Sequence, residues 1–115
     1  MQDNQYKKNV WGKWEDIAKE LYESHWYICK YKNFTIRGGE IDLVMQNSVN
    51  MIFVEVKVVN FMDNLHDYIT SKKLQTLKRA IDTYLWKCPT TKIVRMDVVF
   101  VKDDKIIEVY KNIDM

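Results

Sequence analysis

Two stretches of the chain repeat their apolar residues at the spacing of an α-helix. The first runs from Trp11 to Ser24, and its apolar stripe consists of Trp11, Trp14, Ile17, Ala18, Leu21 and Tyr22. The second runs from Ile69 to Leu85, and Pro89 ends it because proline lacks an amide hydrogen and clashes with the preceding turn. The pattern therefore predicts two helices.

The remaining segments have the short apolar runs that are typical of strands. The expected strands are 27–31, 40–45, 51–59, 92–102 and 106–110. Turn residues at 47–50 make 40–59 a predicted hairpin, and a polar loop is expected around 60–67. The order α-β-β-β-α-β-β predicts one α/β domain over residues 1–115, with a central mixed β-sheet flanked by helices. The polar residues 1–10 are where disorder is expected.

Charged residues interrupt two of the predicted strands. In 51–59 the side chains alternate, so Glu55 and Lys57 share a face with apolar neighbours. In 40–45, Ile41 and Leu43 are expected to face one way and Asp42 the other. A hairpin can place the carboxylates of Asp42 and Glu55 side by side, where two like charges repel and a divalent cation removes the conflict. The alternative is an ordinary exposed ion pair between Glu55 and Lys57.

A third carboxylate comes from the first helix. Glu15 lies at the edge of its apolar stripe, from which it can point along the sheet toward Asp42 and Glu55. If Glu15 stood alone, a solvated helix charge would be the preferred interpretation. Oxygen donors with no matching His or Cys cluster favour Mg²⁺ or Mn²⁺ over zinc.

Composition narrows the function classes only slightly. The formal charge is +2, too small to identify a nucleic-acid-binding protein without help from its distribution. Neither cysteine stands in a C-x-x-C motif, so no disulfide framework or zinc knuckle is indicated; Cys29, Cys88, His25 and His66 are interpreted as structural or surface residues. No stretch is apolar enough to span a membrane, and a cytoplasmic protein is expected.

The segments 38–44 (Gly-Gly-Glu-Ile-Asp-Leu-Val) and 53–57 (Phe-Val-Glu-Val-Lys) resemble those of the small bacterial YraN-like uncharacterised proteins. The resemblance continues through Trp14-Glu15, the second helix and 95–99. That family is placed in the restriction-endonuclease-like PD-(D/E)XK fold, which the resemblance therefore implies here. Ile41 stands where the name of the motif has proline, a common variation.

The resemblance also implies roles for individual residues. Asp42 and Glu55 would ligate the metal together with the Val56 carbonyl, and Glu15 would be an accessory ligand. Lys57 would orient or activate the attacking water. Lys73 would contact phosphate or support the site.

Other residues are nucleic-acid-binding candidates by their chemistry. Basic residues that could contact phosphates are Arg37, Lys72, Lys73, Lys78 and Arg79, although a solvated helix face explains most of them almost as well. The Gly38-Gly39 loop could let the backbone approach a phosphate, or it could be a plain turn.

The favoured function is a Mg²⁺- or Mn²⁺-dependent nuclease that hydrolyses phosphodiester bonds of DNA, with branched or junction DNA suggested by similarity to junction resolvases of the same fold. A resolvase needs two paired active sites, hence a two-fold homodimer. Two alternatives stay open: a nucleic-acid-binding module of nuclease fold with a silent or partner-dependent site, and a structural protein that kept the fold.

Overall fold

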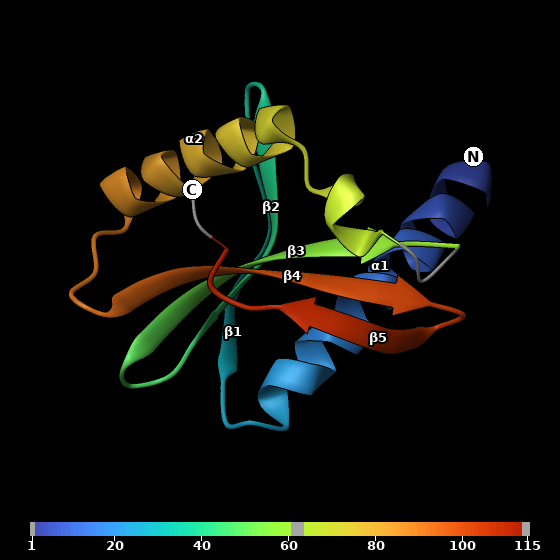
Figure 1. Cartoon of the computed structure of the whole chain (residues 1–115), viewed down its shortest axis with the longest axis horizontal. Coiled ribbons are helices and arrows are strands. Elements are labelled where there is room, and N and C mark those ends of the chain that lie inside the picture. The colour runs from blue at the N-terminus through green and yellow to red at the C-terminus, as the bar shows by residue number, and fades with distance from the viewer. Residues whose placement is uncertain (1, 61–63, 114–115) are drawn as a thin grey trace.

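The helices and strands of the computed structural model follow the predicted order. The structure describes the backbone of residues 2–60 and 64–113, and the side chains of residues 12–60 and 64–113. The elements are α1 (Gln2–Glu23), β1 (Ile28–Ile36), β2 (Gly39–Gln46), β3 (Asn50–Val58), the 3₁₀-helix η1 (Leu65–Tyr68), α2 (Ser71–Lys87), β4 (Ile93–Lys102) and β5 (Lys105–Tyr110), as Figure 1 shows.

The strands form one mixed sheet in the order β1-β2-β3-β4-β5. β3 and β4 are parallel, and the other neighbouring pairs are antiparallel. The predicted hairpin at 40–59 is present, and the side chain of Asn47 closes its turn by accepting hydrogen bonds from the amides of Val49 and Asn50. A parallel pair needs a crossover connection, and α2 provides it between β3 and β4.

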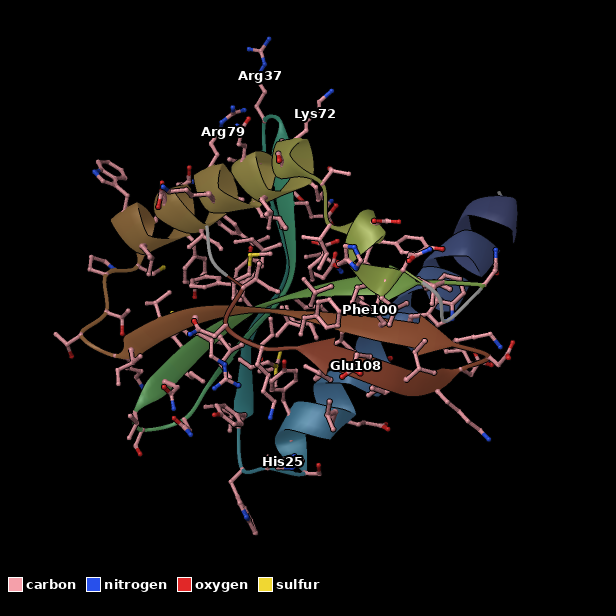
Figure 2. All side chains as sticks on the ribbon, viewed as in Figure 1. His25, Arg37, Lys72, Arg79, Phe100 and Glu108 are labelled. Carbon is pink, nitrogen blue, oxygen red and sulfur yellow. The ribbon has the colours of Figure 1, made fainter. Side chains whose placement is uncertain are left out.

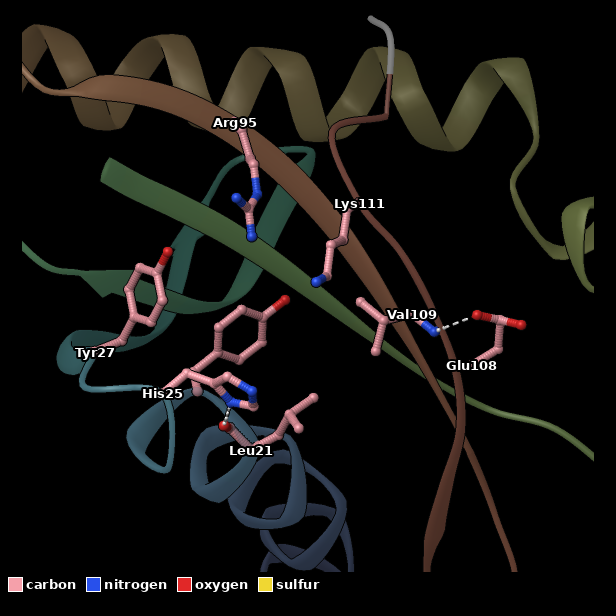
Figure 3. A pocket seen from close by; sticks show the side chains of 8 residues that line it. Leu21, His25, Tyr27, Arg95, Glu108, Val109 and Lys111 are labelled. Atoms are coloured by element: carbon pink, nitrogen blue, oxygen red, sulfur yellow. Dashed lines mark hydrogen bonds between the residues drawn. The ribbon is translucent and has the colours of Figure 1, made fainter. Parts of the chain in front are cut away.

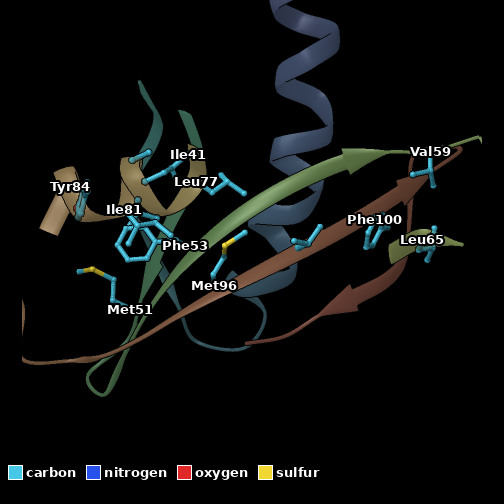
Figure 4. Packing of buried hydrophobic residues seen from close by; sticks show 13 residues of the cluster. Ile41, Met51, Phe53, Val59, Leu65, Leu77, Ile81, Tyr84, Met96 and Phe100 are labelled. Carbon is cyan, nitrogen blue, oxygen red and sulfur yellow. The ribbon is translucent and has the colours of Figure 1, made fainter. Parts of the chain in front are cut away.

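The two helices cover opposite faces of the sheet (Figure 1). Successive residues of β3 alternate between the two sides: Phe53 packs in the cluster that contains α2, whereas Ile52 and Val54 pack in the cluster that contains α1. Figure 4 shows the first of these clusters, which extends along the sheet from Tyr84 and Leu77 of α2 to Leu65 of η1. The predicted α/β sandwich, a mixed sheet between helices, is thereby confirmed.

The sequence of α2 explains how it packs on the sheet. Its buried residues Leu77, Ala80, Ile81 and Tyr84 recur at helical spacing on one face. The ring of Tyr84 meets that of Phe53 edge to face at 5.5 Å between centroids. At the other end, the hydroxyl of Thr70 caps the helix by accepting the amide hydrogen of Lys73, which fixes Lys73 in the first turn.

Several boundaries differ from the prediction. α1 begins at Gln2 and not at Trp11, so residues 2–10 are helical here, and their disorder stays a prediction about the protein in solution. β1 continues five residues beyond Tyr31, to Ile36. The prediction stopped early because this edge strand alternates exposed and half-buried residues and has no continuous apolar run to mark its length. Within the expected loop 60–67 the structure has the start of η1, and residues 61–63 lie outside the described residues.

None of the described helices combines the length and the hydropathy needed to cross a bilayer.

Candidate active site

Three of the predicted carboxylates line one pocket of about 230 Å³. Glu15 comes from α1, Asp42 from β2 and Glu55 from β3; the full lining is Trp14, Glu15, Glu40, Asp42, Glu55, Val56 and Val58. The pairing of β2 with β3 ends at Leu43 and Val54, although both strands continue. The pocket therefore lies where the two strands separate and α1 passes beside them.

Asp42 occupies the edge of β3 where β2 no longer pairs. Its Oδ2 accepts the amide hydrogen of Val56 at 2.8 Å, so a side chain takes the place of a backbone partner. The amide and the carbonyl of one strand residue point to the same neighbouring strand. The carbonyl of Val56 therefore faces the same edge as the Asp42 carboxylate, as a ligand of a shared cation must.

The prediction that Ile41 and Leu43 share a face is wrong. Ile41 packs in the cluster of α2, whereas Leu43 packs in the cluster of α1. The break falls at Asp42. Its neighbour on β1 is Asn33, which has a left-handed φ of 57° and does not pair with Asp42, although the residues on either side of both do pair. This irregularity interrupts the alternation of β2 at Asp42, whose carboxylate reaches β3 instead of joining either apolar cluster.

Glu55 is the most buried carboxylate of the pocket, with 6% of its surface exposed. Burial, followed by the negative charge of Asp42, raises the pKa of Glu55 to about 8, although the charges of Lys73 and Lys57 oppose the shift. The Lys73 ammonium lies 3.6 Å from Oε1. Oε2 is buried and has no hydrogen-bond partner among the described residues. When Glu55 is ionised, Lys73 therefore neutralises the charge near Oε1, and Oε2 has no positive partner among the described residues.

Glu15 shows the same shortage. Burial, followed by the charge of Asp42, raises its pKa to about 7, while Lys32 and the Asn33 amide favour the ionised form. Within the part of the chain that the structure describes, its Oε2 is also buried without a partner. Buried polar atoms normally have a hydrogen-bond partner. Two carboxylate oxygens without one in the same pocket indicate that a ligand from outside the chain would satisfy them.

The donor set fits a divalent cation that prefers oxygen. Asp42, Glu55, Glu15 and the carbonyl of Val56 offer only oxygen atoms, the ligands of Mg²⁺ and Mn²⁺. Among the described residues, no group of three or more His, Cys, Asp or Glu side chains is arranged so that it could hold a metal ion as it stands, so the fit rests on one or two carboxylates with the Val56 carbonyl. An open site agrees with Mg²⁺, which keeps several water molecules and uses one or two carboxylates.

The other candidates are not part of the pocket lining. Lys57 is half-buried on β3, close enough for its charge to lower the pKa of Glu55. Lys72 and Arg37 are exposed. Figure 2 shows both on the same side of the molecule as Arg79, with their side chains directed outward. We call Arg37, Lys72 and Arg79 the basic face.

Both glycines of the Gly38-Gly39 turn have structural reasons to be glycine. Gly38 has a left-handed φ of 87°. A Cβ on Gly39 would lie 2.8 Å from the backbone carbonyl oxygen of Thr76. The turn therefore packs tightly against α2, which holds Arg37 next to the basic residues of that helix.

Sequence reasoning missed Glu40, which also lines the pocket and whose charge helps to raise the pKa of Glu15. Its position two residues before Asp42 was a signal, since residues two apart in a strand share a face. The pairing of Lys73 with Glu55 was not foreseen either, because it joins α2 to β3 and depends on how the helix lies on the sheet.

The fold and the pocket define a class: a small α/β protein with an acidic pocket between a helix and two separating strands, in which two carboxylate oxygens have no partner among the described residues. The profile of the uncharacterised protein family UPF0102 matches residues 14–101 of the chain. The chain is 36% identical to a UPF0102 protein of Aliarcobacter butzleri over 105 residues, which cover 87% of this chain and 94% of that protein. It is 31% identical to one of Carboxydothermus hydrogenoformans, with 69% of each chain covered. The protein belongs to the UPF0102 family, which confirms the YraN-like resemblance.

Proposed function

We propose that the protein is a divalent-metal-dependent nuclease of restriction-endonuclease-like fold that hydrolyses phosphodiester bonds of DNA. One observation carries the proposal: carboxylates from three separate elements meet in one pocket, and two of them have a buried oxygen without a partner among the described residues. Burying carboxyl groups next to one another disfavours their ionised forms, which appears as the raised pKa values of Glu15 and Glu55, and nothing in the packing of the sheet requires this cost. Binding a divalent ion is the function that accounts for the arrangement.

The ion would be Mg²⁺ or Mn²⁺, held by Asp42, Glu55, the Val56 carbonyl and Glu15. When bound, it polarises a phosphoryl oxygen and lowers the pKa of a coordinated water. Asp42 has a further role without the ion, because its hydrogen bond to the Val56 amide keeps the edge of β3 in position. Lys57, beside Glu55, stabilises the negative charge that builds up on the phosphate and orients the attacking water.

The basic face supplies contacts to the substrate. Arg37 projects from the turn that packs on α2, and Lys72 lies in the first turn of α2, next to Lys73. These side chains can bind successive phosphates leading to the pocket, without reading sequence. Branched or junction DNA is the substrate to test first, and cutting a junction symmetrically requires a two-fold homodimer.

A second candidate function is a nucleic-acid-binding module whose site is silent. It is favoured by Lys73, whose ammonium already lies 3.6 Å from Glu55 and partly neutralises it. In that case Lys73 would serve as a permanent counter-ion, and the acidic pocket would have no use for a metal.

Cleavage assays separate the two functions. Purified protein is incubated with linear, flapped and four-way DNA in Mg²⁺, Mn²⁺, Ca²⁺ or chelator. The nuclease proposal predicts cleavage in Mg²⁺ or Mn²⁺ and binding alone in Ca²⁺, whose larger and looser coordination shell does not align water for attack. Binding in every condition with cleavage in none would support the silent module.

Matched variants exclude a contaminating nuclease. Glu55→Gln keeps the size of the side chain and removes an ionised ligand, so cleavage should be lost. Glu20→Gln makes the same chemical change at an exposed position of α1, outside the pocket, and should cleave as the wild type does. Activity that survives in Glu55→Gln would not come from this site.

A further inference from the structure

A second and larger pocket lies apart from the acidic one. It measures about 620 Å³ and is formed by the C-terminal end of α1, the connection from α1 to β1, strands β4 and β5, and Lys111 just after β5. The two pockets share no residue. Figure 3 shows Arg95, Lys111, Tyr27 and His25 around it. Its volume is in the range of small-molecule sites, roughly 300–1,000 Å³.

Arg95 is held in a fixed orientation at this pocket. Its Nε and Nη2 donate to the two carboxylate oxygens of Asp97 at 3.0 and 3.1 Å, and Asp97 is completely buried. A guanidinium has more N–H donors than one carboxylate can use. The described residues provide no acceptor for Nη1, and this edge of the fork is free for a second anion.

The carboxylates near the pocket do not compete for that edge. Asp97 is saturated, because it also accepts the Tyr22 hydroxyl at 2.6 Å and the amide of Asn112 at 3.0 Å. Glu108 accepts the amide of Val109, and Figure 3 shows it beyond Val109, with its carboxylate turned away from Arg95. An anion in the pocket would therefore meet the positive charges first.

Lys111 places a second positively charged donor beside Arg95. Lys111 is exposed, and in Figure 3 its ammonium points into the same space as the guanidinium. The Nδ1 of His25 is 2.9 Å from the Leu21 carbonyl, to which it can only donate, so Nε2 is the nitrogen left for a ligand, and it donates a hydrogen bond only when the imidazole is protonated. A fork and a point charge that converge in this way suit a phosphate group.

Aromatic rings form another wall. The rings of Tyr22 and Tyr27 meet edge to face at 5.8 Å between centroids. Tyr27 is half-buried, and no hydrogen bond of its hydroxyl lies within the described part of the chain. A planar base can stack on such a ring whatever its identity.

We propose that this pocket binds a nucleoside monophosphate group, with its phosphate on Arg95 and Lys111 and its base against Tyr27. The group is either a free nucleotide or the 5′-phosphorylated terminal nucleotide of a strand. The proposal does not depend on the nuclease function, because it uses none of the residues of the acidic pocket and needs no metal.

Binding is measured by calorimetry and by amide chemical shifts, with chelator present so that no metal can attract phosphate to the acidic pocket. The probes are deoxyadenosine 5′-monophosphate, deoxyadenosine, inorganic phosphate, and a short single strand with or without a 5′-phosphate. We expect saturable binding of the monophosphate, with changes in the amide chemical shifts of Tyr27 and Lys111, and no binding of deoxyadenosine. Tighter binding of the 5′-phosphorylated strand than of the monophosphate would assign the site to strand ends, and the reverse order to free nucleotides.

Variants test the two parts of the pocket without disturbing the buried Asp97. Lys111→Gln should weaken monophosphate binding about tenfold, whereas Lys105→Gln, an exposed change on β5 outside the pocket, should leave it unchanged. Tyr27→Leu should weaken binding of the monophosphate but not of inorganic phosphate. No binding of any probe at millimolar concentration, or equal binding by Lys111→Gln and the wild type, would overturn the proposal.

Discussion

Replacing Glu55 by glutamine should make the metal-free protein more stable at neutral pH. The pKa of Glu55 is raised from 4.5 to about 8, chiefly by burial and then by the charge of Asp42. Between these two values the folded protein holds a proton that the unfolded chain has released. The stability of the wild type therefore falls as pH rises through this window. Glutamine does not ionise and resembles the protonated acid, so the variant should not lose stability as the pH rises.

The size of the effect follows from the same shift. Each pH unit inside the window corresponds to about 1.4 kcal/mol. At pH 7 the variant should be more stable by an amount on the order of 3 kcal/mol, or roughly 10 °C in Tm for a chain of this length. Because Glu55 is almost fully buried, solvent screens this energy little. Near pH 4.5 the two proteins should have the same stability.

Denaturant unfolding from pH 4.5 to 8 in chelator measures the difference directly. Glu20→Gln, with the same chemical change at an exposed site of α1, should follow the wild type at every pH. Saturating Mg²⁺ should then stabilise the wild type and not Glu55→Gln, since only the wild type has the full ligand set. A variant that is less stable than the wild type at pH 7, or a difference that does not change with pH, would refute the electrostatic account of Glu55.

Three further substitutions test other parts of the structure. Lys57→Ala should abolish hydrolysis while weakening DNA binding only modestly, because only one cation among several phosphate contacts is lost. Gel-shift and cleavage assays on the same substrate measure the two losses, and equal losses of binding and cleavage would indicate a binding role. Gly39→Ala should destabilise the fold by about 1–3 kcal/mol, because its Cβ would meet a backbone carbonyl of α2. Gly12→Ala, whose Cβ would meet nothing within 4 Å, should instead stabilise α1 by about 0.5–1 kcal/mol. Thermal unfolding that ranks the two variants the other way round would contradict the packing of the turn. Tyr22→Phe should lower the free energy of unfolding by about 1–3 kcal/mol, since it removes a hydrogen bond from the buried carboxylate of Asp97. An unchanged denaturant-unfolding curve would show that this hydrogen bond contributes nothing to stability.

The elements that the sequence predicted best are those whose pattern follows from local spacing. The apolar stripe of α2 and the turn at Asn47 each lie within a short segment, and the structure has both. Asp42 and Glu55 were also found locally, because each breaks an apolar strand and the short hairpin between them brings them into one pocket.

What the sequence did not reveal depends on how elements far apart in the chain pack together. Lys73 reaches Glu55 only because α2 crosses the sheet at a particular place. The larger pocket joins Tyr27, Arg95 and Lys111, which no spacing rule connects. The break in alternation at Asp42 lies opposite the left-handed backbone of Asn33 on the neighbouring strand, so the pattern of β2 taken alone gave the wrong face for its neighbours.

The central claim is that the acidic pocket holds a divalent ion, and anomalous diffraction from crystals soaked in Mn²⁺ tests it most directly. The account predicts one strong peak in the pocket, coordinated by the carboxylates of Asp42 and Glu55 and by the carbonyl of Val56, with Lys73 moved away from Glu55. A pocket without a peak at saturating Mn²⁺, with the Lys73 ammonium still 3.6 Å from Glu55, would contradict it.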